Sequence, residues 1–260
     1  ACSSRVLERT MTPSVQIIGL RLPEVRRGAD LPALVLRAAA RQREEVRSGD
    51  IVVLTQKIVS KAEGREVRLA TVRPSPLAKL WARRVKRDPR FIELVLRESR
   101  RVLRMSDRAL VVETRHGFVC ANAGVDHSNV AGTGRVTLLP DDPDASAQRF
   151  AQAIRKRTGA RIAVIISDTW GRPWREGQVN VTIGAAGLRV LADWRGRRDT
   201  FGRRLSATVL AVADELAAAA GLAMGKVDQV PVVIIRGYRF QRGRDPARKL
   251  LRPAQHDLFR

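Results

Sequence analysis

The segment IAVIISDTWGRPWREGQ, residues 162–178, carries the strongest structural signal in this chain. Its first five residues are all apolar, which predicts a buried strand over 162–166. This strand delivers Asp168 and Thr169 at its end, before Pro173 interrupts the backbone. Because an acid at the end of a buried strand is a natural ligand for a hard metal ion, the segment predicts a core strand that leads into a metal site.

Two arginines and two tryptophans follow these oxygen ligands. The guanidinium groups of Arg172 and Arg175 are planar donor forks that suit phosphate or carboxylate groups. The tryptophans give the loop a rigid apolar body. With Asp168 and Thr169, these residues predict a phosphate-handling active site of the magnesium or manganese type. The alternative is a strand followed by a basic surface turn, and it is disfavoured because other segments of the chain supply matching groups.

Length and composition fit an ordinary globular protein of one or two domains, with 260 residues, 44% of them apolar and 29% charged. No apolar run reaches the length of a membrane span or of a signal peptide, so we expect a cytoplasmic protein with no membrane partner. The cysteines, Cys2 and Cys120, are far apart, which argues against a disulfide framework and a zinc site. The 3 histidines are too few for an imidazole-rich site, so any metal is expected to be oxygen-bound.

A formal net charge of +23 invites a nucleic-acid assignment. The basic residues are spread along the whole chain, and aromatic residues make up only 4%, so the stacking platforms of single-strand and RNA binders are missing. We therefore expect no specific nucleic-acid partner. A basic enzyme that attracts polyanionic small molecules fits the charge better. A basic RNA-associated protein remains the alternative.

Apolar periodicity and turn signals predict alternating helices and strands, with no internal repeat and no long linker. Such a chain should form one interlocked unit with two lobes. The predicted helices cover 31–46, 77–85, 91–103, 145–157 and 203–220. The predicted strands cover 15–18, 51–57, 162–166, 179–184 and 230–237, with a hairpin formed by ALVVET and HGFVCA over 109–121. The residues from Tyr238 onward are expected to be less ordered.

The chain lacks the common nucleotide-binding motifs. No lysine is followed by Ser or Thr, which excludes a Walker A loop, and no G-x-G-x-x-G follows a strand. Outside the SDT segment, suitable groups are Lys57 and Lys61 in TQKIVSK, and Asp126 and Asn129 in ANAGVDHSN. Two lysines four residues apart also suit a solvated helix face, and an aspartate also suits a turn. These segments predict a nucleotide site of another kind.

Taken together, the motifs closely resemble coenzyme F-420-0:L-glutamate ligases, the CofE family, which add glutamates to a deazaflavin redox coenzyme. The resemblance runs from about residue 17 to residue 237, and several motifs occur in the same order. These motifs are QKIVSKAEG (56–64), HGFVCANAGVDHSN (116–129), SDTWGRPWREGQVNVTIGAAGL (167–188), and DELAAAAGLAMGK (214–226) followed by PVVIIRG (231–237).

The resemblance implies an α+β fold of the family's own, with two lobes and an interlocked homodimer. It also implies GTP as co-substrate, two manganese or magnesium ions, and potassium as activator. We accordingly divide the chain into an N-terminal extension (1–14), a ligase domain (15–237) and a basic C-terminal tail (238–260). Longer relatives carry an additional flavin domain at the C-terminal end. This sequence does not include that domain, so no flavin chemistry is expected. A weak hint of the dimer is an apolar stripe on the helix predicted over 203–220, formed by Leu205, Val209, Val212 and Leu216.

Carried over residue by residue, the resemblance places the metal ligands at Asp126 and Asp168, with Thr169 beside the second ion. In some members a glutamine occupies the position of Lys226. A protonated lysine cannot bind a metal, so we interpret Lys226 as a phosphate contact, unless its backbone carbonyl supplies the ligand. The implied nucleotide contacts are Leu22, Pro23, Glu24, Val25, Gln56, Lys57, Lys61, Asn129, Met224, Gly225 and Lys226.

Amide formation explains why such an enzyme needs GTP. A carboxylate is a poor electrophile, so the lactyl carboxylate of F-420-0 would first attack the γ-phosphate of GTP, giving an acyl phosphate that the amine of glutamate then opens. The expected catalytic residues are Asp126 and Asp168 through the metal ions, and Lys61 or Lys57 at the phosphates. Arg172 and Arg175 are candidates for the coenzyme's phosphodiester or the substrate carboxylates. A GTP-binding module without catalysis is the further alternative.

Overall fold

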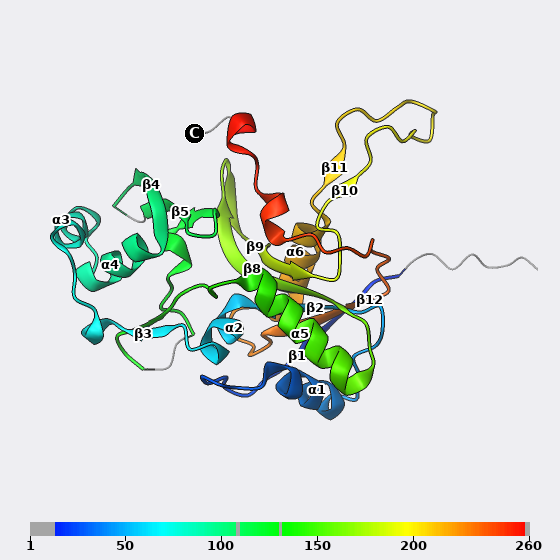
Figure 1. The fold of residues 1–260 in the computed structure, drawn as a ribbon, viewed down its shortest axis with the longest axis horizontal. Coiled ribbons are helices and arrows are strands. Elements are labelled where there is room, and N and C mark those ends of the chain that lie inside the picture. The colour runs from blue at the N-terminus through cyan, green and yellow to red at the C-terminus, as the bar shows by residue number, and fades with distance from the viewer. Residues whose placement is uncertain (1–13, 108–109, 130–131, 258–260) are drawn as a thin grey trace, which may run out of the picture.

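A computed structural model of the chain describes residues 14–107, 110–129 and 132–257. The predicted N-terminal extension, 1–14, lies outside these residues except for Ser14. Helices and several sheets are mixed along the chain, so the α+β class is confirmed (Figure 1). Among the described residues, no helix is both long enough and apolar enough to cross a lipid bilayer.

The centre of the molecule is a mixed sheet of five strands (Figure 1). β2 and β8 run parallel to each other, and the remaining neighbours pair antiparallel. In spatial order the strands are β1 (Gln16–Leu20), β12 (Val232–Arg236), β2 (Ile51–Thr55), β8 (Ala163–Arg172) and β9 (Arg175–Ala186).

Helices cover both faces of this sheet, which explains its continuous apolar strands. One face packs into a first core with α1 (Leu31–Arg41) and α5 (Pro143–Thr158). The other face packs into a second core with α6 (Val212–Met224). Neighbouring residues of one strand alternate between the two cores: Val164 and Ile166 of β8 belong to the first, Ile165 to the second. The interior strands β2 and β8 therefore have no polar face until they reach their carboxyl ends.

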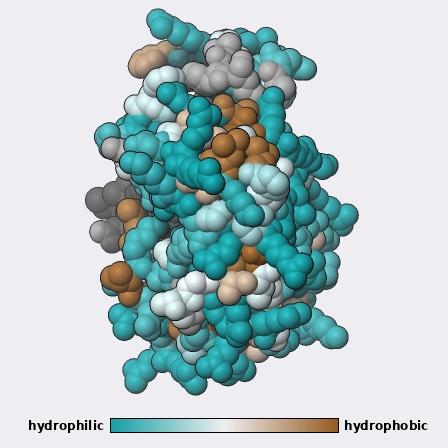
Figure 2. Space-filling model, turned by 90° about the vertical axis from the view of Figure 1, so that its left-hand side faces the viewer, coloured by the Kyte–Doolittle hydropathy of each residue, from teal (hydrophilic) through white to brown (hydrophobic). Residues whose placement is uncertain are grey.

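A third core lies beside the sheet, at the left of Figure 1. It is formed by α3 (Pro76–Val85) and α4 (Pro89–Arg97) against a sheet of β4 (Ser99–Met105), β5 (Leu110–Thr114) and β6 (Val119–Ala121). The pair β3 (Glu66–Arg68) and β7 (Arg135–Thr137) connects this part of the chain to the central sheet. Figure 2 shows this end of the molecule, where a patch of hydrophobic residues is surrounded by hydrophilic ones.

Several predicted elements are confirmed, namely the helices over 77–85 and 145–157, the strands within β1, β9 and β12, and the hairpin of β5 and β6. The strand predicted over 51–57 ends at Thr55, and α2 (Gln56–Ala62) begins at the next residue. Ile58 and Val59 of this helix are buried in the first core, so burial of an apolar face favours a helix over a longer strand. The change matters because it places Lys57 in the first helical turn.

Two predicted helices are shorter than expected. α1 and α4, predicted over 31–46 and 91–103, end at Arg41 and Arg97. After α1 the backbone leaves the helix at Arg43, which has a φ of +57°. After α4, pairing with β5 makes the next segment the strand β4. Tertiary pairing therefore overrides the helical periodicity of that segment.

The long helix predicted over 203–220 is wrong in its first half. α6 begins at Val212, and the preceding residues belong to an arm in which β10 (Ala192–Asp193) pairs with β11 (Val209–Leu210). The arm extends away from the sheet (Figure 1). Because Leu205 and Val209 lie outside the helix, the apolar stripe proposed as a dimer hint does not exist.

The strand predicted over 162–166 continues to Arg172, because β9 pairs with β8 beyond the point where β2 ends. Asp168 therefore lies within a hairpin strand, one residue past the last pairing with β2.

The expectation of a less ordered C-terminal tail is also wrong for its described residues. Tyr238 and Phe240 pack against the second core, and Ala247 is fully buried in it. The carboxylate of Asp144 accepts hydrogen bonds from the backbone N–H groups of both Ala247 and Ala185, at 2.9 and 2.8 Å. These bonds attach the tail to the central sheet.

Candidate active site

A cavity of about 660 Å³ opens at the carboxyl ends of β2 and β8. This edge is where ligands bind in sheets with parallel strands, because helices begin and loops diverge there. The lining includes the predicted metal ligands Asp126, Asp168 and Thr169. It also includes every residue predicted as a nucleotide contact: Leu22, Pro23, Glu24, Val25, Gln56, Lys57, Lys61, Asn129, Met224, Gly225 and Lys226. Segments far apart in sequence thus meet in one cavity, while the roles of their residues stay predictions.

Asp126 forms one side of a cluster with Lys57. Its backbone pairs with Thr137 of β7 through hydrogen bonds in both directions, which fixes the loop that carries it. Lys57 Nζ lies 2.6 Å from Asp126 Oδ2. Ser128 donates to the same carboxylate from its backbone N–H, at 2.8 Å, and from its hydroxyl, at 2.7 Å. Burial opposes ionisation of Asp126, but the hydrogen bonds from Lys57 and Ser128 outweigh it and hold its pKa below the ordinary value.

Asp168 lies across the cavity on β8, and its environment has the opposite effect. Burial raises the pKa of Asp168 above its ordinary value, and the nearby charge of Asp126 adds to the rise. The indole N–H of Trp170 donates to Asp168 Oδ2 at 2.8 Å and partly offsets this shift. Without a cation beside it, Asp168 therefore favours its neutral form more than Asp126 does.

Thr169 already has partners within the cavity. Its hydroxyl accepts from Lys226 Nζ at 2.7 Å and donates to Asn180 Oδ1 at 2.8 Å. Burial, followed by the positive charge of Lys57, lowers the pKa of Lys226. Gly225, which precedes it, has a φ of +57° and a ψ of −155°, a backbone conformation that residues with a side chain rarely adopt, so glycine suits this turn.

Lys61 is almost enclosed and is held by the 22–25 turn. Its ammonium group lies 2.6 Å from Glu24 Oε1, and its side chain is only 7% exposed against 56% for Glu24. The ion pair brings this turn onto α2, which forms one wall of the cavity. Lys61 thus contacts Glu24, whereas Lys57 is the lysine that contacts an acid of the proposed metal site.

Arg172 and Arg175 do not line the cavity. They face each other at the tip of the β8–β9 hairpin, and Arg172 donates to the backbone carbonyl of Glu176 at 2.7 Å. The sequence prediction placed them beside Asp168 because it ended the strand early. The extended hairpin instead carries them along β8 and β9, away from the acids.

Sequence reasoning missed Ser128, Asn180 and Trp170. Ser128 and Asn180 line the cavity, and Trp170 contacts Asp168 from outside the lining. Asn180 could have been found from the register of the β8–β9 hairpin, because it lies opposite Thr169 in that hairpin. That register depends on the turn at Pro173, whereas the sequence prediction ended the strand at residue 166.

The donor set fits a magnesium or manganese ion that is completed by a ligand. Among the described residues, no group of three or more His, Cys, Asp or Glu side chains could hold a metal by itself. Asp126 and Asp168 supply two carboxylates, and Thr169 supplies a hydroxyl. Magnesium commonly binds through one or two carboxylates while water and substrate phosphates supply the other oxygens. A second ion beside Thr169 requires Lys226 to leave that hydroxyl.

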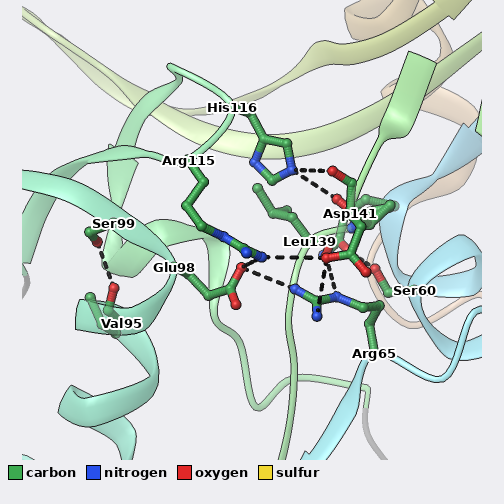
Figure 3. Close-up of polar contacts among 11 residues, drawn as sticks. Ser60, Arg65, Val95, Glu98, Ser99, Arg115, His116, Leu139 and Asp141 are labelled. Carbon is green, nitrogen blue, oxygen red and sulfur yellow. Dashed lines mark hydrogen bonds and ion pairs between the residues drawn. The ribbon is translucent and has the colours of Figure 1, made fainter. Parts of the chain in front are cut away.

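An ion-pair network outside the cavity lining connects the turn between β5 and β6 to segments next to α2, α4 and α5 (Figure 3). Arg65 and Arg115 converge on Glu98 Oε2, at 3.0 and 2.9 Å, and both also approach Asp141, at 3.3 and 3.4 Å. Glu98 is only 10% exposed, so its charge depends on these partners. His116 lies beside the network, with its Nε2 2.9 Å from the carbonyl oxygen of Pro140. The network fixes the turn between β5 and β6 against the rest of the molecule.

Known proteins resemble this chain along nearly its whole length. The F420-0:Gamma-glutamyl ligase family model matches residues 19–237. A protein of Methanothermobacter thermautotrophicus named Coenzyme F420:L-glutamate ligase is 48% identical, and the match covers 95% of this chain and 99% of that protein. Proteins of the same name from Methanopyrus kandleri and Methanocaldococcus jannaschii are 45% and 40% identical. Those matches cover 91% and 95% of this chain, and 94% and 97% of the relatives.

Proposed function

Since the chain belongs to the F420-0:gamma-glutamyl ligase family, we propose that it joins L-glutamate to coenzyme F-420-0, and then adds further γ-linked glutamates, with GTP converted to GDP and phosphate. The observation that supports this most directly is the meeting of Asp126 and Asp168 with Lys57 and Lys226 in one cavity. Two acids and two lysines around a cavity at the carboxyl ends of parallel strands suit a nucleoside triphosphate with its cation.

The energetic problem in this reaction is the low reactivity of a carboxylate toward an amine. In the proposed mechanism, a carboxylate oxygen of F-420-0 forms a bond to the γ-phosphorus of GTP, and the bond to the leaving β-phosphate oxygen breaks. The amine of glutamate then attacks the carbonyl carbon of the acyl phosphate, and phosphate leaves with the original carboxylate oxygen. The proton lost by the amine passes to solvent. No covalent bond to the enzyme is needed.

The residues of the chain bind and orient these groups. Lys57 and Lys226 line the cavity, where their ammonium groups would contact phosphate oxygens. Lys61 holds the 22–25 turn through Glu24, which closes one side of the nucleotide site. Asp126 and Asp168 would hold the manganese or magnesium ions, with Thr169 beside the second. The ions would neutralise negative charge on the phosphates.

Other parts of the proposal follow the family resemblance. We propose potassium as an activator, a division into two lobes, and an interlocked homodimer. Arg172 and Arg175 lie outside the cavity, so they would contact the distal part of the coenzyme or its phosphodiester. Light scattering at micromolar concentration tests the dimer, since a stable species of the sequence mass, 28.8 kDa, would contradict it.

A direct test incubates the protein with GTP, manganese, F-420-0 and glutamate, and follows the coenzyme by mass spectrometry. Glutamate additions that require GTP support the proposal. GTP binding without product would indicate a binding module instead. Salt-sensitive binding to generic RNA without GTP consumption would indicate an RNA-associated protein. The Asp168→Asn variant serves as the inactive control.

A further inference from the structure

Trp170 contacts the proposed metal ligand from outside the cavity. It lies two residues after Asp168 on β8, on the same face of the strand, and its indole Nε1–H donates to Asp168 Oδ2 at 2.8 Å. Trp170 does not line the cavity, and its hydrogen bond to Asp168 connects it to the proposed metal site. The indole N–H can only donate, and the carboxylate can only accept when ionised. Any effect of Trp170 on the site therefore acts through Asp168.

Aromatic packing fixes the indole ring. The ring of Phe118 meets it edge-on, with centroids 5.4 Å apart and an interplanar angle of 61°. Phe118 is itself 4% exposed, and the ring of His116 stacks on it at 5.8 Å. His116 in turn contacts the carbonyl oxygens of Pro140 and Asp141 (Figure 3). The rings of Phe118 and His116 therefore support, in series, the indole that binds Asp168.

This aromatic series comes from the turn between β5 and β6, which belongs to the sheet beside the third core. Phe118 nevertheless packs in the first core, under the central sheet. Arg115, in the same turn, pairs with Glu98, and Glu98 also pairs with Arg65. The turn is thus attached on both sides, and Phe118 and Trp170 link it to Asp168.

We propose that Trp170 is a positioning residue that holds the carboxylate of Asp168 in the orientation that binds the divalent cation. This inference rests on the metal assignment in the proposed function. A free aspartate carboxylate rotates about its last torsion, and a hydrogen bond from a packed indole removes that freedom. Removing such an outer hydrogen bond from a metal ligand typically weakens metal binding by about 10- to 100-fold.

The test compares Trp170→Phe with Trp174→Phe. The first keeps an aromatic ring against Phe118 but removes the N–H donor. The second is the same substitution on the same hairpin, at a side chain that is 85% exposed. Manganese is titrated into each protein, first alone and then with GDP to supply phosphate oxygens, and free manganese is measured by electron paramagnetic resonance. We expect Trp170→Phe to raise the dissociation constant at least about tenfold and Trp174→Phe to change it less than about twofold.

The rate of glutamate addition gives a second readout. Trp170→Phe should need more manganese for half-maximal rate, while kcat at saturating manganese stays within about threefold of the unsubstituted protein, because the reacting groups are unchanged. A residue that only supports the fold would instead lower the melting temperature and leave the manganese affinity of the folded protein unchanged.

Equal manganese affinity in Trp170→Phe and the unsubstituted protein would overturn the inference but leave the proposed function standing. No saturable manganese site in the unsubstituted protein, either alone or with GDP present, would overturn the metal assignment and the inference together. If Trp170→Phe does not fold, Phe118→Leu replaces it, because this change keeps the donor and loosens the ring that holds it. Manganese affinity unchanged in Phe118→Leu would then overturn the inference.

Discussion

Replacing Asp168 by asparagine should reduce activity without weakening the fold. The amide oxygen of asparagine can still accept the hydrogen bond from Trp170, so the variant removes the charge and little else. Burial raises the folded-state pKa of Asp168 above its unfolded value, so the folded state binds this proton more tightly. Stability therefore falls as pH rises from the unfolded pKa to the folded pKa. At neutral pH, Asp168→Asn should be as stable as the unsubstituted protein or more stable.

Asp126→Asn should have the opposite effect on stability. Its folded-state pKa is lowered, so its contribution to stability is present above the unfolded pKa and is lost as pH falls through the folded pKa. The side chain is 44% exposed and solvent screens its pair with Lys57, so the loss at neutral pH should be about 1 kcal/mol. The two variants therefore differ in stability although both remove a carboxylate.

Their activities should nevertheless fall together. Loss of either proposed metal ligand should reduce turnover about a hundredfold or more, which corresponds to at least about 2.7 kcal/mol of transition-state stabilisation. Urea unfolding at neutral pH gives the stabilities, and initial rates of glutamate addition at limiting manganese give the activities. The reasoning fails if either variant keeps more than about a third of normal activity. It also fails if Asp168→Asn is clearly less stable than Asp126→Asn.

Three further predictions concern an ion pair at the amino end of β2, a lysine of the cavity, and the two arginines at the tip of the β8–β9 hairpin. Arg236→Met leaves Asp50, which is 2% exposed, as a buried carboxylate without its arginine partner. The free energy of unfolding measured in urea should fall by about 3 kcal/mol, and a fall of less than about 1 kcal/mol contradicts this prediction. Lys226→Met should raise the KM for GTP about tenfold, because a charged phosphate contact is lost and methionine supplies no oxygen ligand in its place, and an unchanged KM argues against that contact. Arg172→Ala and Arg175→Ala should raise the KM for F-420-0 and leave that for GTP unchanged, and the reverse pattern would place them at the nucleotide.

The strands of the central sheet were predictable because burial on both faces leaves a signal in single segments. The apolar run 162–166 identified β8, and 230–237 identified β12. The length of β8 was not predictable in the same way. Its second half is a strand because β9 pairs with it, and that pairing depends on a turn at Pro173 that also reads as a strand end. The positions of Arg172 and Arg175 follow from the same pairing, so they could not be predicted either.

The candidate site was only partly visible in the sequence. Local motifs indicated Asp126, Asp168 and Lys57, but each also suited a turn or a solvated surface. Their meeting in one cavity depends on contacts between distant segments, such as the bond from Lys57 to the loop that carries Ser128. The role of Trp170 was hidden for the same reason, because its support comes from the β5–β6 turn. Spacing along one chain does not contain that information.

The central claim is that GTP activates the carboxylate of F-420-0 before glutamate binds to it covalently. The most direct test uses F-420-0 labelled with ¹⁸O in that carboxylate, and measures the product and the released phosphate by mass spectrometry. The account predicts one ¹⁸O atom in phosphate for each first glutamate added, together with one GDP. Glutamate addition with unlabelled phosphate would contradict the acyl phosphate, and the absence of any glutamate product would contradict the ligase itself.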